Sequence, residues 1–331
     1  MKKYIFISLV LVSSVVLSQT VQFSQFYANQ VYLNPAFTGN TQINRIAAGY
    51  RNQWAGVPKA FNSFSVAYDH NLAVYNVGLG LTAYHDQAGS GGLGYTSLSG
   101  LVSYRYQIKE NLMASAGISW GVAIRSANAS NYVFGDQFIT GGATTANIEE
   151  RKVFGDFNAG FLVYNENFWG GLSGAHLNRP NEALVAGQSA RIPIQWTMHG
   201  GYRFVLDESS KGEPEKSLTP CLNYKFSSKF DQMDIGAYYQ RRKLILGMWY
   251  RGMPLIKKND DGTSNKDALV FLIGMKKEGL RIGYSYDLTV SGISVKDSYG
   301  SHEISLVYEW PTQVRKKKKR KKAFIIPCPK F

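Results

Sequence analysis

The sequence predicts an all-β protein: a transmembrane antiparallel β-barrel of about 14 strands, with a short N-terminal periplasmic helix or plug segment and a basic C-terminal periplasmic tail. Three observations predict this fold: a secretory leader, side chains that alternate with a period of two, and connections that alternate between short and long. The composition agrees, because aromatic residues form 14% of the chain and charged residues only 18%. Tyrosine and tryptophan favour membrane–water boundaries.

Residues 1–18 are expected to be a secretory signal peptide. Two lysines precede an apolar run from Ile5 to Leu17, which is too short to span a bilayer as a helix and matches the charged and apolar regions of a leader. Val16 and Ser18 supply small residues for cleavage after Ser18, and no cysteine follows there, which argues against a lipoprotein. An uncleaved anchor helix is the alternative.

Residues 19–40 are expected to form a periplasmic or plug segment ahead of the barrel. Its apolar residues recur at helical spacing, namely Phe23, Phe26, Tyr27 and Val31. Asn34 should end that helix, because a residue before proline, here Pro35, avoids the α region. Gly39 then releases the chain into the first strand. We expect a short helix that packs under or into the barrel mouth, with a ligand-binding role as the alternative.

Residues 41–310 are expected to form the barrel, because apolar side chains recur at every second position. In the stretch LMASAGISWGVAI one face carries Leu112, Ala114, Ala116, Ile118, Trp120, Val122 and Ile124. The stretches LRIGYSYDL and EISLVYEW repeat the alternation. We expect Ile118 and Trp120 to face lipid and Ser119 to face the lumen. The small and polar residues of the second face predict a wet or loosely filled lumen.

The alternating runs number about fourteen, an even number as expected of single-chain bacterial barrels. They are expected to start near Thr41, Phe61, Val74, Gly94, Leu112, Val153, Trp169, Pro193, Lys216, Asp234, Leu244, Ala268, Leu280 and Glu303. Pro220 weakens the run from Lys216, because proline cannot donate a hydrogen bond to a strand ladder.

The connections between these runs give a separate indication of topology. After even-numbered runs they are mostly short, at 71–73, 109–111, 165–167, 240–243 and 277–279, with 207–212 somewhat longer. After odd-numbered runs they are mostly long, at 128–151, 178–191, 252–266 and 289–302, with 227–232 short. Bacterial barrels place short turns in the periplasm and long loops outside. Both termini are therefore expected in the periplasm.

Residues 311–331 form a tail whose charge differs from that of the barrel. The net charge of the chain is +14, of which the basic run of the tail supplies +8 and the signal peptide +2. That run comprises Arg315, Lys316, Lys317, Lys318, Lys319, Arg320, Lys321 and Lys322, and the apolar residues after it are Phe324, Ile325, Ile326 and Phe331. Like charges so closely spaced repel one another, so the run should be extended and solvated.

Three roles compete for this tail. A nucleic-acid patch is excluded by secretion. Weak attraction to the anionic headgroups of membrane lipid is the second role. The third is a docking arm for a periplasmic protein. The apolar end favours it, because solvation needs no apolar segment, whereas Phe324 to Phe331 can anchor in a groove of a partner or add to its sheet edge.

No catalytic, cofactor or metal site is predicted. Cys221 and Cys328 lie in a strand-like run and in the tail, and the five histidines form no close-spaced ligand pair. The stretch GSGGLG lacks the following helix and the lysine of a phosphate loop, and the sequence contains no H-E-x-x-H. An enzyme whose catalytic groups are distant in sequence is the remaining alternative.

Three stretches in this order resemble a known family. YLNPAFTG after a signal peptide, YRNQW from Tyr50 to Trp54 and the terminal CPKF are similar to the PorP/SprF family of type IX secretion-associated outer-membrane proteins of Bacteroidota. The resemblance covers the whole mature chain. Its motif residues are expected to be structural or docking elements: Asn34, Pro35, Gly39, Tyr50, Arg51 and Trp54.

The resemblance implies a non-enzymatic barrel that helps to export a partner protein or attach it to the cell surface, in some members a gliding adhesin. Expected partners are the type IX secretion system, periplasmic cell-envelope proteins, an exported surface protein and outer-membrane lipid. Nucleic acid and cofactors are not expected. A passive channel or a transporter of hydrophobic solutes is the alternative. The basic tail with its apolar end favours the secretion role, because transport needs no such arm.

Overall fold

The computed structural model of the chain describes residues 23–41, 43–57, 61–89, 91–128, 137–138, 141–142, 144, 149–208, 214–228, 230–253, 266–290 and 298–310. The signal peptide expected at 1–18 and the tail at 311–331 lie outside the described residues. All the docking residues expected between Arg315 and Phe331 therefore stay predictions.

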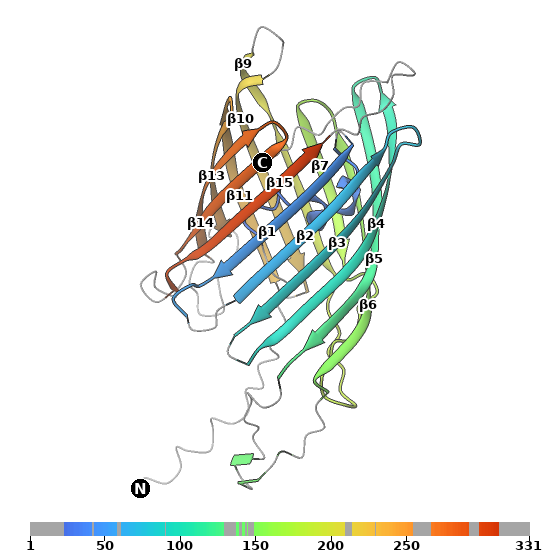
Figure 1. Cartoon of the computed structure of the whole chain (residues 1–331), viewed down its shortest axis with the longest axis vertical. Coiled ribbons are helices and arrows are strands. Elements are labelled where there is room, and N and C mark those ends of the chain that lie inside the picture. Colours follow the sequence, from blue (N-terminus) through green and yellow to red (C-terminus); the bar gives the residue numbers. More distant parts are fainter. Residues whose placement is uncertain are drawn as a thin grey trace.

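The described strands form one antiparallel barrel, which closes where β15 pairs with β1 (Figure 1). The strands are β1 (Asn44–Gln53), β2 (Phe61–Leu72), β3 (Val77–Ala88), β4 (Leu93–Lys109), β5 (Leu112–Ser126), β6 (Arg151–Tyr164), β7 (Phe168–Ala175), β8 (Gln195–Tyr202), β9 (Phe204–Glu208), β10 (Pro214–Ser227), β11 (Phe230–Arg241), β12 (Leu244–Gly252), β13 (Lys266–Lys277), β14 (Leu280–Thr289) and β15 (Ser301–Trp310). Among the described residues, no helix is long and apolar enough to cross a membrane.

Strands β8 and β9 share one position of the barrel, because both pair with β10 and are separated only at Arg203. The barrel therefore has the fourteen positions that the sequence predicts. Strand β10 pairs with β9 through Leu218 and with β8 from Cys221 onward. The gap lies at Pro220, which has no N–H to donate. The proline thus interrupts one ladder locally without ending the strand.

The alternation of faces is confirmed on β5. Ile118 and Trp120 are 49% and 64% exposed on the outer face, whereas Ser119 between them is 5% exposed on the lumenal face. Outer positions of β14 and β15 carry further exposed apolar side chains, including Ile282, Tyr284, Ile304 and Leu306. This outer surface is apolar where the hydrocarbon layer would lie.

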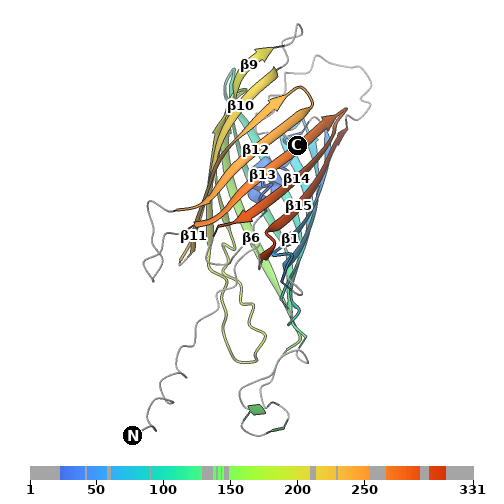
Figure 2. The same ribbon diagram turned by 90° about the vertical axis from the view of Figure 1, so that its left-hand side faces the viewer.

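The two ends of the barrel differ in their connections. One end carries the turns 73–76, 110–111, 165–167, 209–213, 242–243 and 278–279, and we call it the short-turn end. The other carries 54–60, 89–92, 127–150, 176–194, 228–229, 253–265 and 290–300, and we call it the long-connection end. In Figure 1 strand β1 starts near the upper, short-turn end, and Figure 2 shows the same barrel turned by 90° about the vertical axis.

The lumen is packed in its middle instead of being loosely filled, which corrects the expectation from sequence. Residues 23–41, which we call the plug, lie inside the barrel (Figure 1). The main hydrophobic core joins plug residues such as Phe26, Tyr27 and Phe37 to inward-facing wall residues such as Leu162 and Trp249. The small side chains of the wall leave room for this segment, so the barrel is filled by its own chain.

Candidate functional site

The plug runs along the lumen from one end of the barrel toward the other. It contains one turn of helix, α1 (Gln30–Leu33), and a 3₁₀ turn, η1 (Pro35–Phe37). The helix is shorter than the spacing of its apolar residues predicts, but it ends at Asn34 as expected, where the backbone is extended with φ −155° and ψ 120°. Proline at the next position excludes the α region there.

Asn34 fixes the middle of the plug to the barrel wall. Its Nδ2 donates to the carbonyl oxygens of Phe161 at 3.1 Å and Leu172 at 3.3 Å, and it lies 3.0 Å from Nε2 of His199. Its Oδ1 accepts from the N–H of Ala36 at 2.9 Å and so caps the turn that Pro35 begins. A single buried amide therefore joins β6, β7 and β8 to the plug.

Lumenal serines satisfy the backbone of the plug, which gives the small polar face of the strands a definite role. Ser173 Oγ donates to the carbonyl oxygen of Leu33 at 2.8 Å, Ser115 Oγ to that of Ala36 at 2.8 Å, and Ser103 Oγ to that of Thr38 at 2.7 Å. These carbonyls lie at the end of α1, within η1 and just after it, in turns too short to satisfy them internally. Buried polar groups need such partners, because leaving one unsatisfied costs about 1–3 kcal/mol.

At the short-turn end the plug is held by charged side chains around Gly39. The N–H of Gly39 donates to Oδ2 of Asp69 at 2.8 Å, and its carbonyl accepts from Arg105 at 2.6 Å. Arg45 bonds the other oxygen of Asp69 at 2.7 Å and Gln30 Oε1 at 2.6 Å. Gly39 has φ +68°, and a Cβ there would lie 2.5 Å from Cα of Gly78. Only glycine allows this close turn out of the lumen.

At the long-connection end a buried cluster of charges holds the start of the plug. We call it the clamp, and its members are Arg51, Asp234, Arg251, Asp287 and Glu303, all at most 4% exposed. Arg51 pairs with Asp287 at 2.8 Å and Glu303 at 3.2 Å. Arg251 pairs with Asp234 at 2.7 Å and Asp287 at 3.1 Å. These pairs link β1, β11, β12, β14 and β15.

The clamp binds two backbone N–H groups and one side-chain hydroxyl of the plug. Glu303 accepts from the N–H of Ser24 at 2.7 Å and from that of Gln25 at 2.9 Å. Ser24 Oγ donates to Asp287 at 2.6 Å and accepts from Arg51 at 2.9 Å and from Arg251 at 3.0 Å. Charge-assisted hydrogen bonds are about twice as strong as neutral ones. The plug is therefore tied at both ends and in the middle.

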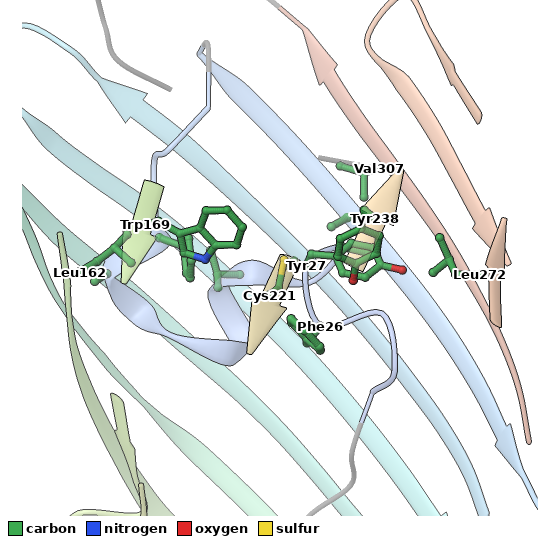
Figure 3. Packing of buried hydrophobic residues seen from close by; sticks show 14 of the residues in the cluster. Phe26, Tyr27, Leu162, Trp169, Cys221, Tyr238, Leu272 and Val307 are labelled. Carbon is green, nitrogen blue, oxygen red and sulfur yellow. The ribbon is translucent and has the colours of Figure 1, made fainter. Parts of the chain in front are cut away.

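Aromatic packing holds the plug between these ties, as Figure 3 shows. The ring of Phe26 lies 4.9 Å from that of Trp249, and the ring of Tyr27 lies 4.7 Å from that of Tyr238, both edge to face. Phe37 stacks on His199 at 5.3 Å. Such pairs contribute about 0.5–1.5 kcal/mol each beyond their buried area. The plug is therefore part of the core.

The motif residues expected from sequence divide into two groups. Asn34, Pro35, Gly39 and Arg51 are all buried in the plugged lumen, but at different levels, with Gly39 at the short-turn end and Arg51 at the long-connection end. The other two lie outside it. Tyr50 is on the outer face of β1, where its hydroxyl donates to Asn62 Oδ1 at 2.9 Å. Trp54 follows β1 with φ 60° and packs on Phe61 at 5.4 Å.

Sequence reasoning missed the clamp partners of Arg51. Asp287 and Glu303 each occupy a lumenal position in an alternating strand. A charged residue on a face of otherwise small or neutral residues could have indicated them as partners of a buried arginine. Which charges would meet depends on barrel closure, because Arg51 is paired in register with Glu303 only when β1 joins β15.

The plug segment that the sequence predicts is confirmed, but it reaches further than one mouth of the barrel. Its first described residue, Phe23, precedes Ser24, which the clamp binds at the long-connection end. Its last residue, Thr41, accepts from Asn71 at the short-turn end. The described part of the segment 19–40 therefore extends through the lumen, because the wall supplies partners along its whole length.

A membrane-spanning barrel filled by its own N-terminal segment is the class of protein that this fold and site define. The family described as type IX secretion system membrane protein PorP/SprF matches residues 15–308. The chain belongs to this PorP/SprF family, and it is an outer-membrane component of the type IX secretion system. The resemblance seen in the sequence is confirmed. No curated protein matches the chain.

Solved barrels show a distant likeness. The toluene transporter TodX of P. putida is 10% identical with a TM-score of 0.49, and the match covers 85% of this chain and 93% of that one. The Ralstonia pickettii toluene transporter TbuX is 10% identical with a TM-score of 0.46, and the match covers 85% and 93%. BamA from Haemophilus ducreyi is 8% identical with a TM-score of 0.42, and the match covers 81% and 70%.

Proposed function

We propose that this protein is a non-enzymatic platform of the type IX secretion system, which holds an exported protein during its export or attachment to the cell surface. The observation that carries this role is the plug. The plug is tied to the barrel wall at both ends of the lumen. The barrel is therefore better suited to bind partners at its two ends than to let a solute pass through. The platform binds its partners without bond chemistry.

The C-terminal tail is proposed to be the periplasmic docking arm. Trp310 ends β15 at the short-turn end, so the polypeptide leaves the barrel on the side expected to be periplasmic. The basic run Arg315 to Lys322 and the apolar run Phe324 to Phe331 are the two parts of this arm. They suit a cell-envelope protein that offers both acidic and apolar surface. Attraction to lipid headgroups is the competing role.

Deleting Arg315 to Phe331 tests this function. The truncated barrel should keep its abundance and its heat-modifiable fold, because β15 ends at Trp310, while surface display of the exported protein should fail. Neutralising Arg315 to Lys322 should weaken docking in a salt-dependent way, because exposed charges are screened beyond about 8 Å at physiological ionic strength.

The apolar part of the arm should behave differently. Changing Phe324, Ile325, Ile326 and Phe331 to serine should weaken docking with little salt dependence, because burial of apolar area drives that contact. Normal surface display by the truncated protein would remove the docking role and leave the tail as a solvated extension.

A further inference from the structure

A cavity of about 130 Å³ lies beside the plug, in the half of the lumen near the long-connection end. Phe23 and Tyr32 of the plug form one side. Its barrel lining comes from the ends of β3, β5, β7 and β10 and the starts of β4, β6 and β8, which lie at the long-connection end. The cavity therefore lies toward the side expected to face the cell exterior.

Four aromatic rings form a continuous wall of this cavity. The ring of Phe23 lies 5.6 Å from that of Tyr32, Tyr32 lies 5.4 Å from Tyr84, and Tyr84 lies 6.0 Å from Tyr95. Aromatic faces attract cations. One cation is already placed there, because the guanidinium carbon of Arg125 lies 5.2 Å from the ring centre of Tyr95.

Asp86 adds a buried carboxylate to that wall. It is the register partner of Tyr95 across β3 and β4, it lines the cavity, and it is only 8% exposed. Ser63 Oγ donates to its Oδ1 at 2.8 Å. Among the ion pairs of the described residues, none includes Asp86. A buried charge is normally paired, because desolvation is costly.

Three other charged groups line the cavity. Arg125 Nε donates to Glu182 at 2.8 Å, and its guanidinium also attracts the carboxylate of Asp86. Asp156 lies 2.9 Å from Nδ1 of His176. Lys225 lines the cavity from β10, and the clamp carboxylate Asp234 attracts its charge without an ion pair between the two among the described residues. Asp86 is therefore the carboxylate of this wall that a bound cation would pair with.

We propose that this cavity binds an organic cation, the guanidinium or ammonium group of a basic side chain, with Asp86 as counter-ion and the tyrosine rings as its wall. This inference rests on the proposed function: the basic side chain belongs to the exported protein, which docks at the long-connection end. The cavity volume is several times the roughly 30 Å³ that one water occupies in the liquid, which leaves room for such a headgroup.

The test uses the purified full-length barrel in detergent, with N-acetyl-L-arginine amide as the probe. Binding is followed by calorimetry and ligand-detected NMR. The arginine probe should bind saturably, and N-acetyl-L-citrulline amide, which has a similar shape without the charge, should bind at least tenfold more weakly. Asp86→Asn should weaken arginine binding at least tenfold, because it removes the charge and keeps the shape.

Asp207→Asn is the matched control, because Asp207 is an exposed carboxylate near the short-turn end, paired with Lys216. It should leave binding unchanged. Equal binding of arginine and citrulline probes, unchanged binding by the Asp86→Asn barrel, or no arginine binding at all would overturn the proposal. If Asp86→Asn does not assemble, the comparison of the two probes on the unmodified barrel still decides.

The two proposals can fail separately. Loss of surface display on removing the tail, together with no arginine binding, would reject the cavity proposal alone. Arginine binding together with normal display by the truncated protein would reject the docking arm alone.

Discussion

Gly160 shows how one missing side chain positions the plug. A Cβ on this residue of β6 would collide with Oδ1 of Asn34, the amide that fixes the middle of the plug. This contact could not be predicted, because Asn34 and Gly160 are distant along the chain. The sequence did predict the local effect of Asn34 and Pro35, because the proline rule depends only on neighbouring residues.

Gly160→Ala should therefore destabilise the assembled barrel by about 1–3 kcal/mol, the usual cost of overpacking a well-filled core. Gly170→Ala is the matched control, because Gly170 lies in the neighbouring strand β7 and a Cβ there meets nothing within 4 Å. The measurement is the midpoint of heat-induced unfolding on gels. Equal midpoints for the two variants would mean that Asn34 is not seated against β6.

The clamp explains at the level of elements why the plug stays in the lumen. Its ion pairs join five strands to one another. One of its members, Glu303, accepts hydrogen bonds from two successive backbone N–H groups of the plug. The sequence predicted the faces of strands such as β5 and the end of the helix at Asn34. It could not predict the clamp, because charges on β1 and β15 meet only after the barrel closes.

Arg51→Met should loosen the plug, because it leaves Glu303 without a cationic partner in the clamp. Breaking a buried ion pair costs about 3–5 kcal/mol, so hydrogen exchange of peptides within 23–41 should accelerate by roughly a hundredfold or more. Arg242→Met is the control. Its pair with Glu215 is exposed, and exposed pairs contribute about 0–1 kcal/mol. Equal protection of the plug in both variants would contradict the role of the clamp.

At the scale of the whole molecule, the fourteen barrel positions and the alternation of short and long connections were predictable, because both follow from local patterns. The path of the plug was not predictable, because it depends on contacts with most of the barrel. Trp310 lies at the short-turn end, which supports a periplasmic C-terminus, whereas Phe23 lies at the long-connection end and favours the opposite side for the start of the plug.

Tags test this topology on intact cells. A tag within 128–151 should be reached by antibody, because this connection belongs to the long-connection end, and a tag after Phe331 should be reached only after the outer membrane is permeabilised. A fluorescent periplasmic protein that stays unlabelled serves as the integrity control. Surface labelling of the tag after Phe331 would reverse the assignment of the two ends of the barrel and would reject the proposed platform role.

A barrel filled by its own chain should act as a platform instead of a channel, and conductance in planar bilayers distinguishes the two. The purified barrel should insert without adding a steady ionic current, because the plug is tied by the clamp and by Asp69 at opposite ends of the lumen. The Arg51→Met barrel should show intermittent openings. A steady open-channel current from the unmodified barrel would contradict the account and favour a passive channel.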